Sequence, residues 1–101
     1  MEKLEPHYEL ATIKAAFADP SSLDRSFVSK QGADDLDMGD AAVAAVIQGL
    51  SAADFDKSMT SMADHRVWQD VYKPRVRGRT LYVKFTLDAM NALLLIRFKE
   101  A

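Results

Sequence analysis

The end of this chain alternates between apolar and polar side chains with a period of two, in the segments 80–87 and 91–99. This alternation predicts two half-buried β-strands, and the polar residues at 88–91 predict a turn between them. The side chains expected on the buried side are Leu81, Val83, Phe85 and Leu87 in the first segment and Leu94, Ile96 and Phe98 in the second. The rest of the chain must then supply a layer that covers this side.

A simple hairpin closed at 88–91 fixes which residues of these two strands face each other. Opposed residue numbers then sum to 179, and the three inward pairs are apolar, as a buried face requires: Phe85 with Leu94, Val83 with Ile96, and Leu81 with Phe98. On the other side, Tyr82 is expected opposite Arg97, with Lys99 as its diagonal neighbour. That side is too polar for a core, and it gathers a phenol with several cations.

A second hairpin is expected to turn at Arg77–Gly78, after a segment rich in β-forming residues. Its simple register, in which opposed numbers sum to 155, places Tyr82 opposite Lys73 and puts Gln69 on the same side. Pro74 cannot donate a hydrogen bond to a neighbouring strand, so a bulge at this position would change the register.

The first half of the chain is predicted to be helical. A first helix is indicated by the spacing of Leu10, Ile13 and Phe17 on one face, and it should end before Asp19–Pro20. Residues 21–31, with Leu23, Phe27 and Val28 near one face, are expected to form a short helix or an irregular segment. Residues 32–39 are acidic and rich in turn formers.

The clearest helix is expected after Asp40, a good N-cap residue. Its apolar positions are Val43, Val46, Ile47 and Leu50. Gly49 fits a left-handed position at its end, and Ser51 to Asp54 resembles a capping box that starts another short turn. The prediction is an α+β fold in one domain, 1–101, with N-terminal helices (1–55) packed on a twisted antiparallel sheet (56–101).

Composition excludes several kinds of site. The chain has no cysteine and two histidines, which excludes disulfides, thiolate nucleophiles, cysteine-ligated zinc and a histidine-rich metal cage. We therefore expect neither metal nor cofactor. The longest apolar run, 41–47, is far shorter than a membrane span, and no secretory signal is visible at the N-terminus, so a cytoplasmic protein is expected.

The net charge of −2 hides an asymmetry between the two halves. Residues 1–50 carry four basic and nine acidic side chains, whereas residues 66–99 carry eight basic and two acidic ones. The second half can present a positive face to a polyanion, or its lysines and arginines can simply solvate exposed strands.

Four segments carry a family resemblance: DFDKSMT (54–60), DHRVWQDVYKPR (64–75), LYVKF (81–85) and RFKEA (97–101). With MEKLEPHYEL (1–10) and IQGLS (47–51), they resemble the motility quorum-sensing regulator toxins, the MqsR family. The resemblance implies a RelE-like ribonuclease fold and a metal-independent endoribonuclease that cuts mRNA at short triplets such as GCU. It also implies an MqsA-like antitoxin with a zinc-binding N-terminal part and a helix-turn-helix DNA-binding part. The toxin then contacts operator DNA only through this antitoxin.

The same resemblance implies four catalytic residues, all of the family's type: Lys57, Gln69, Tyr82 and Lys99. The chain departs from the family pattern in its acidic loop, 34–40, and in Arg97, which can alter phosphate contacts or the preferred triplet.

Metal-free RNA cleavage needs a base for the 2′-hydroxyl, an acid for the 5′-oxygen and positive charge near the phosphorane. Clustered cations lower the pKa of a lysine and so suit it to act as a base. We expect Lys57 or Tyr82 as the base, Lys99 as the charge stabiliser and Gln69 as a residue that orients the phosphate or a nucleobase edge. Lys84 and Arg97 are further candidates for catalysis or RNA binding.

Other residues admit two interpretations each. His65 can pair with Asp64 and act as a base, or it can simply cap a loop. Trp68 can stack on a nucleobase, or it can belong to the core. A basic stretch can contact RNA phosphates or antitoxin carboxylates, or it can be a solvated strand and turn: Lys73, Arg75, Arg77 and Arg79. The alternative to a catalytic toxin is a non-catalytic module that binds RNA or an antitoxin and acts as a transcriptional co-regulator of its operon.

Overall fold

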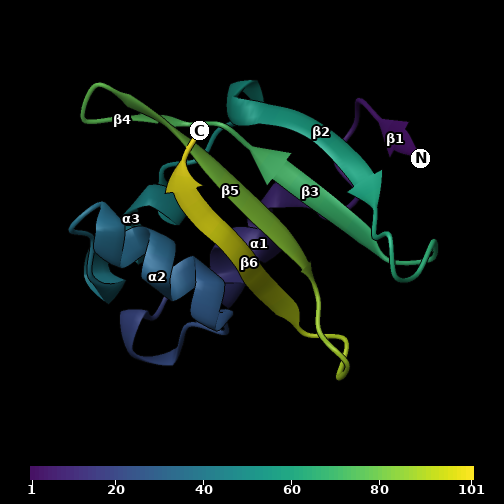
Figure 1. Cartoon of the computed structure of the whole chain (residues 1–101), viewed down its shortest axis with the longest axis horizontal. Coiled ribbons are helices and arrows are strands. Elements are labelled where there is room, and N and C mark those ends of the chain that lie inside the picture. Colours follow the sequence, from purple (N-terminus) through teal and green to yellow (C-terminus); the bar gives the residue numbers. More distant parts are fainter.

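Six antiparallel strands form a twisted sheet with helices packed against it (Figure 1) in the computed structural model, which describes residues 1–101. The strands are β1 (Glu2–Lys3), β2 (Phe55–Thr60), β3 (Trp68–Tyr72), β4 (Arg75–Val76), β5 (Arg79–Leu87) and β6 (Leu93–Glu100). The helices are α1 (Leu10–Ala16), α2 (Phe27–Asp35) and α3 (Asp40–Gln48), with short 3₁₀ turns η1 (Pro20–Ser22) and η2 (Ala52–Asp54). This confirms the predicted α+β class and is consistent with the RelE-like description. No helix is both long and apolar enough to cross a membrane.

The core lies between one face of the sheet and the helices α1 and α3. Its largest members come from both layers: Ile13 and Phe17 from the α1 region, Val43, Ile47 and Leu50 from the α3 region, and Tyr72, Leu81, Val83, Phe85, Leu95 and Phe98 from the sheet. The predicted face of α1 is therefore the buried one, and the helix ends before Pro20 as expected. The opposite face of the central strands has no helix over it (Figure 1).

The ends of α3 differ from the prediction in two details. Gly39 is its N-cap, and Asp40 is instead the first helical residue. Gly49 has a φ of −84°, in the right-handed region, so the left-handed position predicted for it is wrong. The capping box of Ser51 and Asp54 is confirmed.

The sequence predicts only a short helix or an irregular segment where α2 forms, and it places the last turn of this helix in a loop. Ser26 caps it, since its hydroxyl oxygen accepts a hydrogen bond from the Ser29 amide at 3.0 Å. The apolar residues that suggested an inner face, Phe27 and Val28, are 78% and 48% exposed. Small residues face inward instead: a Cβ on Gly32 would lie 2.1 Å from the carbonyl oxygen of Phe98. The helix therefore packs directly on the backbone of β6.

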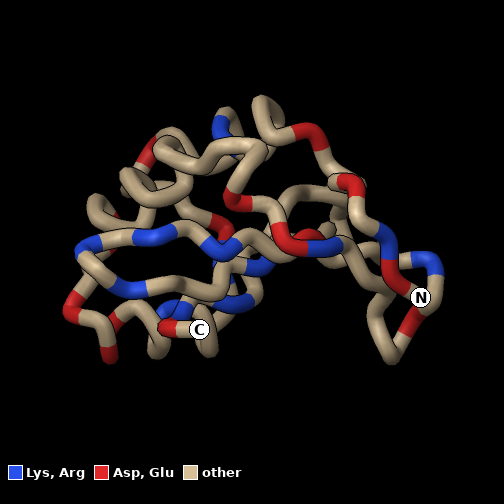
Figure 2. Tube along the Cα trace, turned by 90° about the horizontal axis from the view of Figure 1, so that it is seen from above, with Lys and Arg blue, Asp and Glu red and all other residues tan.

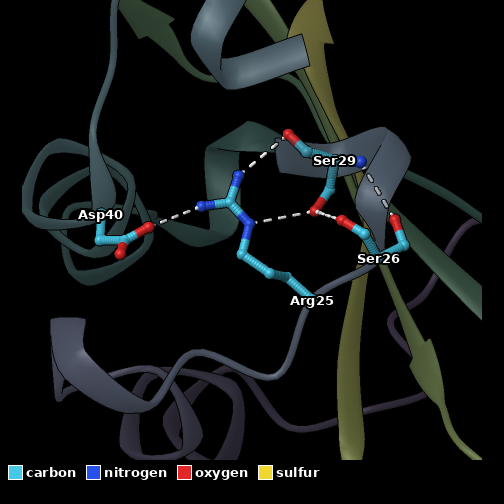
Figure 3. Close-up of polar contacts among 4 residues, drawn as sticks. All are labelled: Arg25, Ser26, Ser29 and Asp40. Atoms are coloured by element: carbon cyan, nitrogen blue, oxygen red, sulfur yellow. Dashed lines mark hydrogen bonds and ion pairs between the residues drawn. The ribbon is translucent and has the colours of Figure 1, made fainter. Parts of the chain in front are cut away.

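Arg25 fixes the position of α2 relative to α3 (Figure 3). Its guanidinium donates to the Ser29 carbonyl at 2.9 Å and to its hydroxyl at 3.2 Å, and it forms an ion pair with Asp40 at 3.2 Å. Only 8% of the Arg25 side chain is exposed. This nearly buried guanidinium makes charge-assisted contacts with both α2 and α3 and so links the two helices, although the Asp40 side of the ion pair is open to solvent.

The hairpin register between β3 or β4 and β5 is confirmed. The opposed numbers sum to 155 in five pairs: Asp70–Phe85, Val71–Lys84, Tyr72–Val83, Arg75–Thr80 and Val76–Arg79. Arg77 and Gly78 both have positive φ, as a tight turn of this hand requires. Pro74 does not disturb the register, because its carbonyl accepts a hydrogen bond from the Leu81 amide at 2.9 Å. Strands β3 and β4 thus behave as one interrupted strand.

The predicted register between β5 and β6 is wrong. Tyr82 lies opposite Lys99, and Lys84 lies opposite Arg97, so opposed numbers there sum to 181. The loop is longer than expected because the Asp88 carboxylate accepts hydrogen bonds from the amides of Met90 and Ala92.

A bulge at Ile96 shifts the register of β6 once more. Phe85 faces Leu95, so opposed numbers sum to 180 from this pair to the loop. Leu95 and Phe98 therefore belong to the core, and neither Leu94 nor Ile96 is fully buried.

A second bulge, at Asp56 in β2, has the same effect. Phe55 pairs with Tyr72 on the core side, whereas Lys57 pairs with Val71 on the open side. In a regular strand, residues two apart share a face. Each bulge therefore turns an apolar residue and a nearby cation to opposite faces of the sheet. The bulge at Asp56 separates Phe55 from Lys57, and the bulge at Ile96 separates Leu95 from Arg97.

Candidate functional site

The open face of the sheet carries a row of side chains from four strands. Strand pairing places Lys57, Val71, Lys84 and Arg97 side by side across β2, β3, β5 and β6. Tyr82 and Lys99 form the next pair along β5 and β6. Three lysines, an arginine and a phenol are thus brought together from segments far apart in the sequence.

Lys84 occupies the centre of this group. Its ammonium group donates to the Gln69 side-chain oxygen at 3.4 Å and lies 5.7 Å from the centre of the Tyr82 ring. The ammonium of Lys99 lies 5.4 Å from the centre of the same ring. We call these six residues the basic cluster: Lys57, Gln69, Tyr82, Lys84, Arg97 and Lys99.

The environment shifts two pKa values in the basic cluster. Burial lowers the pKa of Lys84, and the nearby charges of Arg97, Lys99 and Lys57 lower it further. Burial also raises the pKa of Tyr82, although Lys57 and Arg97 act in the opposite direction. The amine of Lys84 therefore loses its proton more readily than an ordinary lysine, whereas the phenol of Tyr82 stays protonated at neutral pH.

The cations of the cluster differ in how far they are already neutralised. Lys57 forms an ion pair with Glu2 at 3.6 Å, and outside the cluster Lys73 pairs with Asp56 at 3.6 Å. Arg97 and Lys99 are exposed and have no ion-pair partner in the chain. These two charges are thus the ones most available to a phosphate.

Comparison with known proteins gives a family for this fold and site. The family model described as "Motility quorum-sensing regulator, toxin of MqsA" matches residues 5–100. The chain belongs to the MqsR toxin family. It is 37% identical over 100 residues to the mRNA interferase toxin MqsR of Escherichia coli (strain K12), and the match covers 99% of each chain.

The four residues that the MqsR resemblance singled out lie together. Lys57, Gln69 and Tyr82 come from β2, β3 and β5, and Lys99 comes from β6. The roles expected from the sequence remain predictions. The sequence interpretation gave Lys84 no special place among the lysines. The signal present in the sequence was its strand position two residues after Tyr82, on the same face; its place opposite Arg97 comes only from the observed register.

His65 and Trp68 lie away from the basic cluster. His65 is exposed in the loop 61–67. A pair with Asp64, one of its two interpretations from the sequence, is absent, because the Asp64 carboxylate binds Arg66 instead at 3.1 Å. Trp68 is half-buried, and its ring stacks on His7 with the ring centres 5.4 Å apart, while the Lys3 ammonium lies 4.2 Å from the indole. Residues of the N-terminal segment therefore occupy the place that a nucleobase would need.

The basic stretch after β3 leads away from the cluster. Figure 2 shows blue segments along the β4–β5 hairpin, at the left of the picture, and others that meet near the middle of the trace. Arg75, Arg77 and Arg79 are exposed on this hairpin. They extend the positive surface beyond the cluster without sharing its close contacts.

Proposed function

We propose that this toxin is an endoribonuclease that cleaves mRNA without a metal ion, and that it thereby stops translation and growth. The observation that carries the proposal is the half-buried amine of Lys84, set among unneutralised cations and beside a protonated phenol. The name of the E. coli relative, an mRNA interferase, supports the same activity.

The 2′-hydroxyl of the RNA attacks the adjacent phosphorus, and Lys84 accepts its proton. The lowered pKa of Lys84 raises the fraction of neutral amine at any given pH, and the neutral amine is the state that a general base must have. Gln69 accepts one amine hydrogen and so leaves the lone pair free for the hydroxyl. Lys57, a base candidate from the sequence, is paired with Glu2 and serves better as a positive charge.

Tyr82 donates its proton to the 5′-oxygen as the bond from phosphorus to this oxygen breaks. The raised pKa of Tyr82 fits an acid better than the base role considered from the sequence. Arg97 and Lys99 stabilise the negative charge that accumulates on the phosphorane oxygens. The products are a 2′,3′-cyclic phosphate and a 5′-hydroxyl.

The first test is cleavage of a defined transcript by the purified toxin in excess EDTA. We expect cuts at a restricted set of short sequences, with GCU-like triplets as the first candidates, and 2′,3′-cyclic phosphate ends identified by end-group analysis. Loss of cleavage in EDTA would contradict the metal-free mechanism. RNA binding without any cleavage would favour the alternative, a non-catalytic co-regulator.

The partner is a cognate MqsA-like antitoxin. The family description, a toxin of MqsA, supports this pairing. The resemblance in sequence implies that this antitoxin has a zinc-binding part and a helix-turn-helix part, and that the toxin meets operator DNA only through it. The exposed arginines Arg75, Arg77 and Arg79 offer an acidic partner, or the RNA itself, a second contact area.

The pH dependence of cleavage tests the role of Lys84. If Lys84 is the base, kcat/KM rises as pH increases through its lowered pKa. Arg97→Gln removes a positive charge that lowers this pKa. The pKa of Lys84 then rises toward its ordinary value, and the rising limb of the pH–rate profile moves to higher pH. Arg97→Lys keeps the charge and should leave the limb in place; an unmoved limb in Arg97→Gln would remove Lys84 as its cause.

A further inference from the structure

A groove runs between α2 and the outer edge of β6, next to the basic cluster. It has a volume of about 200 Å³, below the roughly 300–1,000 Å³ of pockets for drug-sized ligands, so its size suits a single ring system. Its lining residues are Val28, Gln31, Gly32, Asp35, Arg97, Phe98 and Lys99.

The groove is built into the fold. Gly32 lets α2 approach the Phe98 carbonyl so closely that any side chain there would collide with the backbone of β6. Ser26 ties the start of α2 to β6, since its amide donates to the Leu95 carbonyl and its hydroxyl to the Ile96 carbonyl, both at 2.9 Å. Arg25 holds the other side of α2 to α3 (Figure 3). The groove walls are therefore fixed before any ligand arrives.

Two residues belong both to the groove and to the basic cluster. Arg97 and Lys99 line the groove, and they pair with Lys84 and Tyr82 on β5. Neighbouring strands are about 4.8 Å apart, so the groove at the outer edge of β6 lies about one strand spacing from Lys84 and Tyr82 on β5, which act on the same phosphate as Arg97 and Lys99 in the proposed mechanism. A nucleobase attached next to that phosphate reaches this distance.

The α2 wall of the groove offers groups that read a base edge. Asp35 is exposed and has no ion-pair partner, and its carboxylate can only accept hydrogen bonds. A carboxylate beside an RNA backbone repels phosphate, so we expect it to bind the edge of a nucleobase that carries hydrogen-bond donors. The adjacent N1–H and N2–H groups of guanine match its two oxygens. Gln31 can donate and accept, and the guanidinium of Arg97 can stack on a base plane.

We infer that the groove between α2 and β6 binds the nucleobase next to the scissile phosphate, and that Asp35 selects guanine there. This inference rests on the proposed ribonuclease function and names the source of its sequence preference. It also gives a role to part of the acidic segment 34–40.

The test uses short oligonucleotides with a single ribose, which fixes the position of cleavage. The bases on either side of the scissile phosphate are varied in turn among guanine, inosine and 7-deazaguanine. At one of the two positions, inosine, which lacks only the N2 amino group, should lower kcat/KM about tenfold. Loss of N7 in 7-deazaguanine should have no effect, because the carboxylate contacts the other edge. Asp35→Asn should abolish the difference between guanine and inosine.

Asp34→Asn is the matched control, because Asp34 is an exposed neighbour on α2 that does not line the groove. It should keep the difference between guanine and inosine. Binding of the same oligonucleotides to Lys84→Met protein, followed by fluorescence anisotropy, gives a second readout that does not need cleavage.

The outcomes separate the two proposals. If the wild type cleaves but does not distinguish guanine from inosine, or if Asp35→Asn still does, the groove assignment is overturned and the ribonuclease stands. If nothing is cleaved but binding still depends on guanine and Asp35, the groove assignment stands and the ribonuclease proposal fails. If Asp35→Asn alters only antitoxin binding, the groove belongs to the protein partner and the assignment is overturned.

Discussion

Replacing Lys84 with methionine should slow RNA cleavage by about two to four powers of ten, the usual contribution of a positioned acid–base group. Methionine keeps a long apolar side chain on the half-buried strand position, so the sheet should be preserved. The variant loses the amine that we propose as the acceptor of the 2′-hydroxyl proton. The measurement is the single-turnover rate on a defined RNA at saturating protein, with thermal unfolding as a check of the fold.

Lys30→Met is the matched control, since Lys30 is an exposed lysine on α2 outside both the basic cluster and the groove. Its rate should stay within about twofold of the wild type, as expected for a surface change away from such features. If the Lys84→Met protein is folded and cleaves nearly as fast as the wild type, this result contradicts the assignment of Lys84 as the base.

The second large effect concerns stability. Asp70 is fully buried on β3, and its carboxylate accepts hydrogen bonds from the Ser58 hydroxyl at 2.6 Å and from the amides of His7 and Tyr8, each at 2.9 Å. Asp70→Ala leaves these three donors without a partner. The Ser58 hydroxyl is buried, whereas the two amides are only part-buried. An unsatisfied buried group costs about 1–3 kcal/mol and a part-buried one less, so we expect a total loss of about 3 kcal/mol in the free energy of unfolding.

Urea unfolding followed by circular dichroism measures this loss. For a domain of this size, it should also lower Tm by more than about 10 °C. Asp34→Ala, at an exposed position, should change the free energy of unfolding by less than about 0.5 kcal/mol. Equal stability of Asp70→Ala and the wild type would mean that the contacts between the N-terminal segment and β3 contribute nothing.

The regular parts of this fold could be predicted from the sequence. The alternation in β5 and the turn at Arg77–Gly78 fixed the pairing of three strands, because each local signal agreed with the next. The capping box at Ser51 and the apolar face of α1 could also be predicted from the sequence. In these places the side chains that pack are large and apolar, so their spacing reveals the element.

The irregular parts could not be predicted. Five apolar residues in a row, 92–96, fit either phase of a strand, so the bulge at Ile96 leaves no trace in the pattern. Helix α2 packs through Gly32 and other small residues, so the apolar positions of its sequence indicated the wrong face. The position of Lys84 at the centre of the basic cluster could not be predicted either, because it depends on the observed register, which puts Arg97 opposite Lys84.

Because of the two bulges, at Asp56 and Ile96, the side chains on the open face of the sheet depend on the exact number of residues in β2 and β6. Deleting either residue would restore a regular strand, so that a cation turns inward or an apolar residue turns outward. Natural variants of this toxin should therefore gain or lose residues in the loops 61–67 and 88–92, where an added or lost residue does not change which strand side chains face the core. Within β2 and β6, single insertions or deletions should be absent, because only changes in pairs keep both faces of the sheet intact.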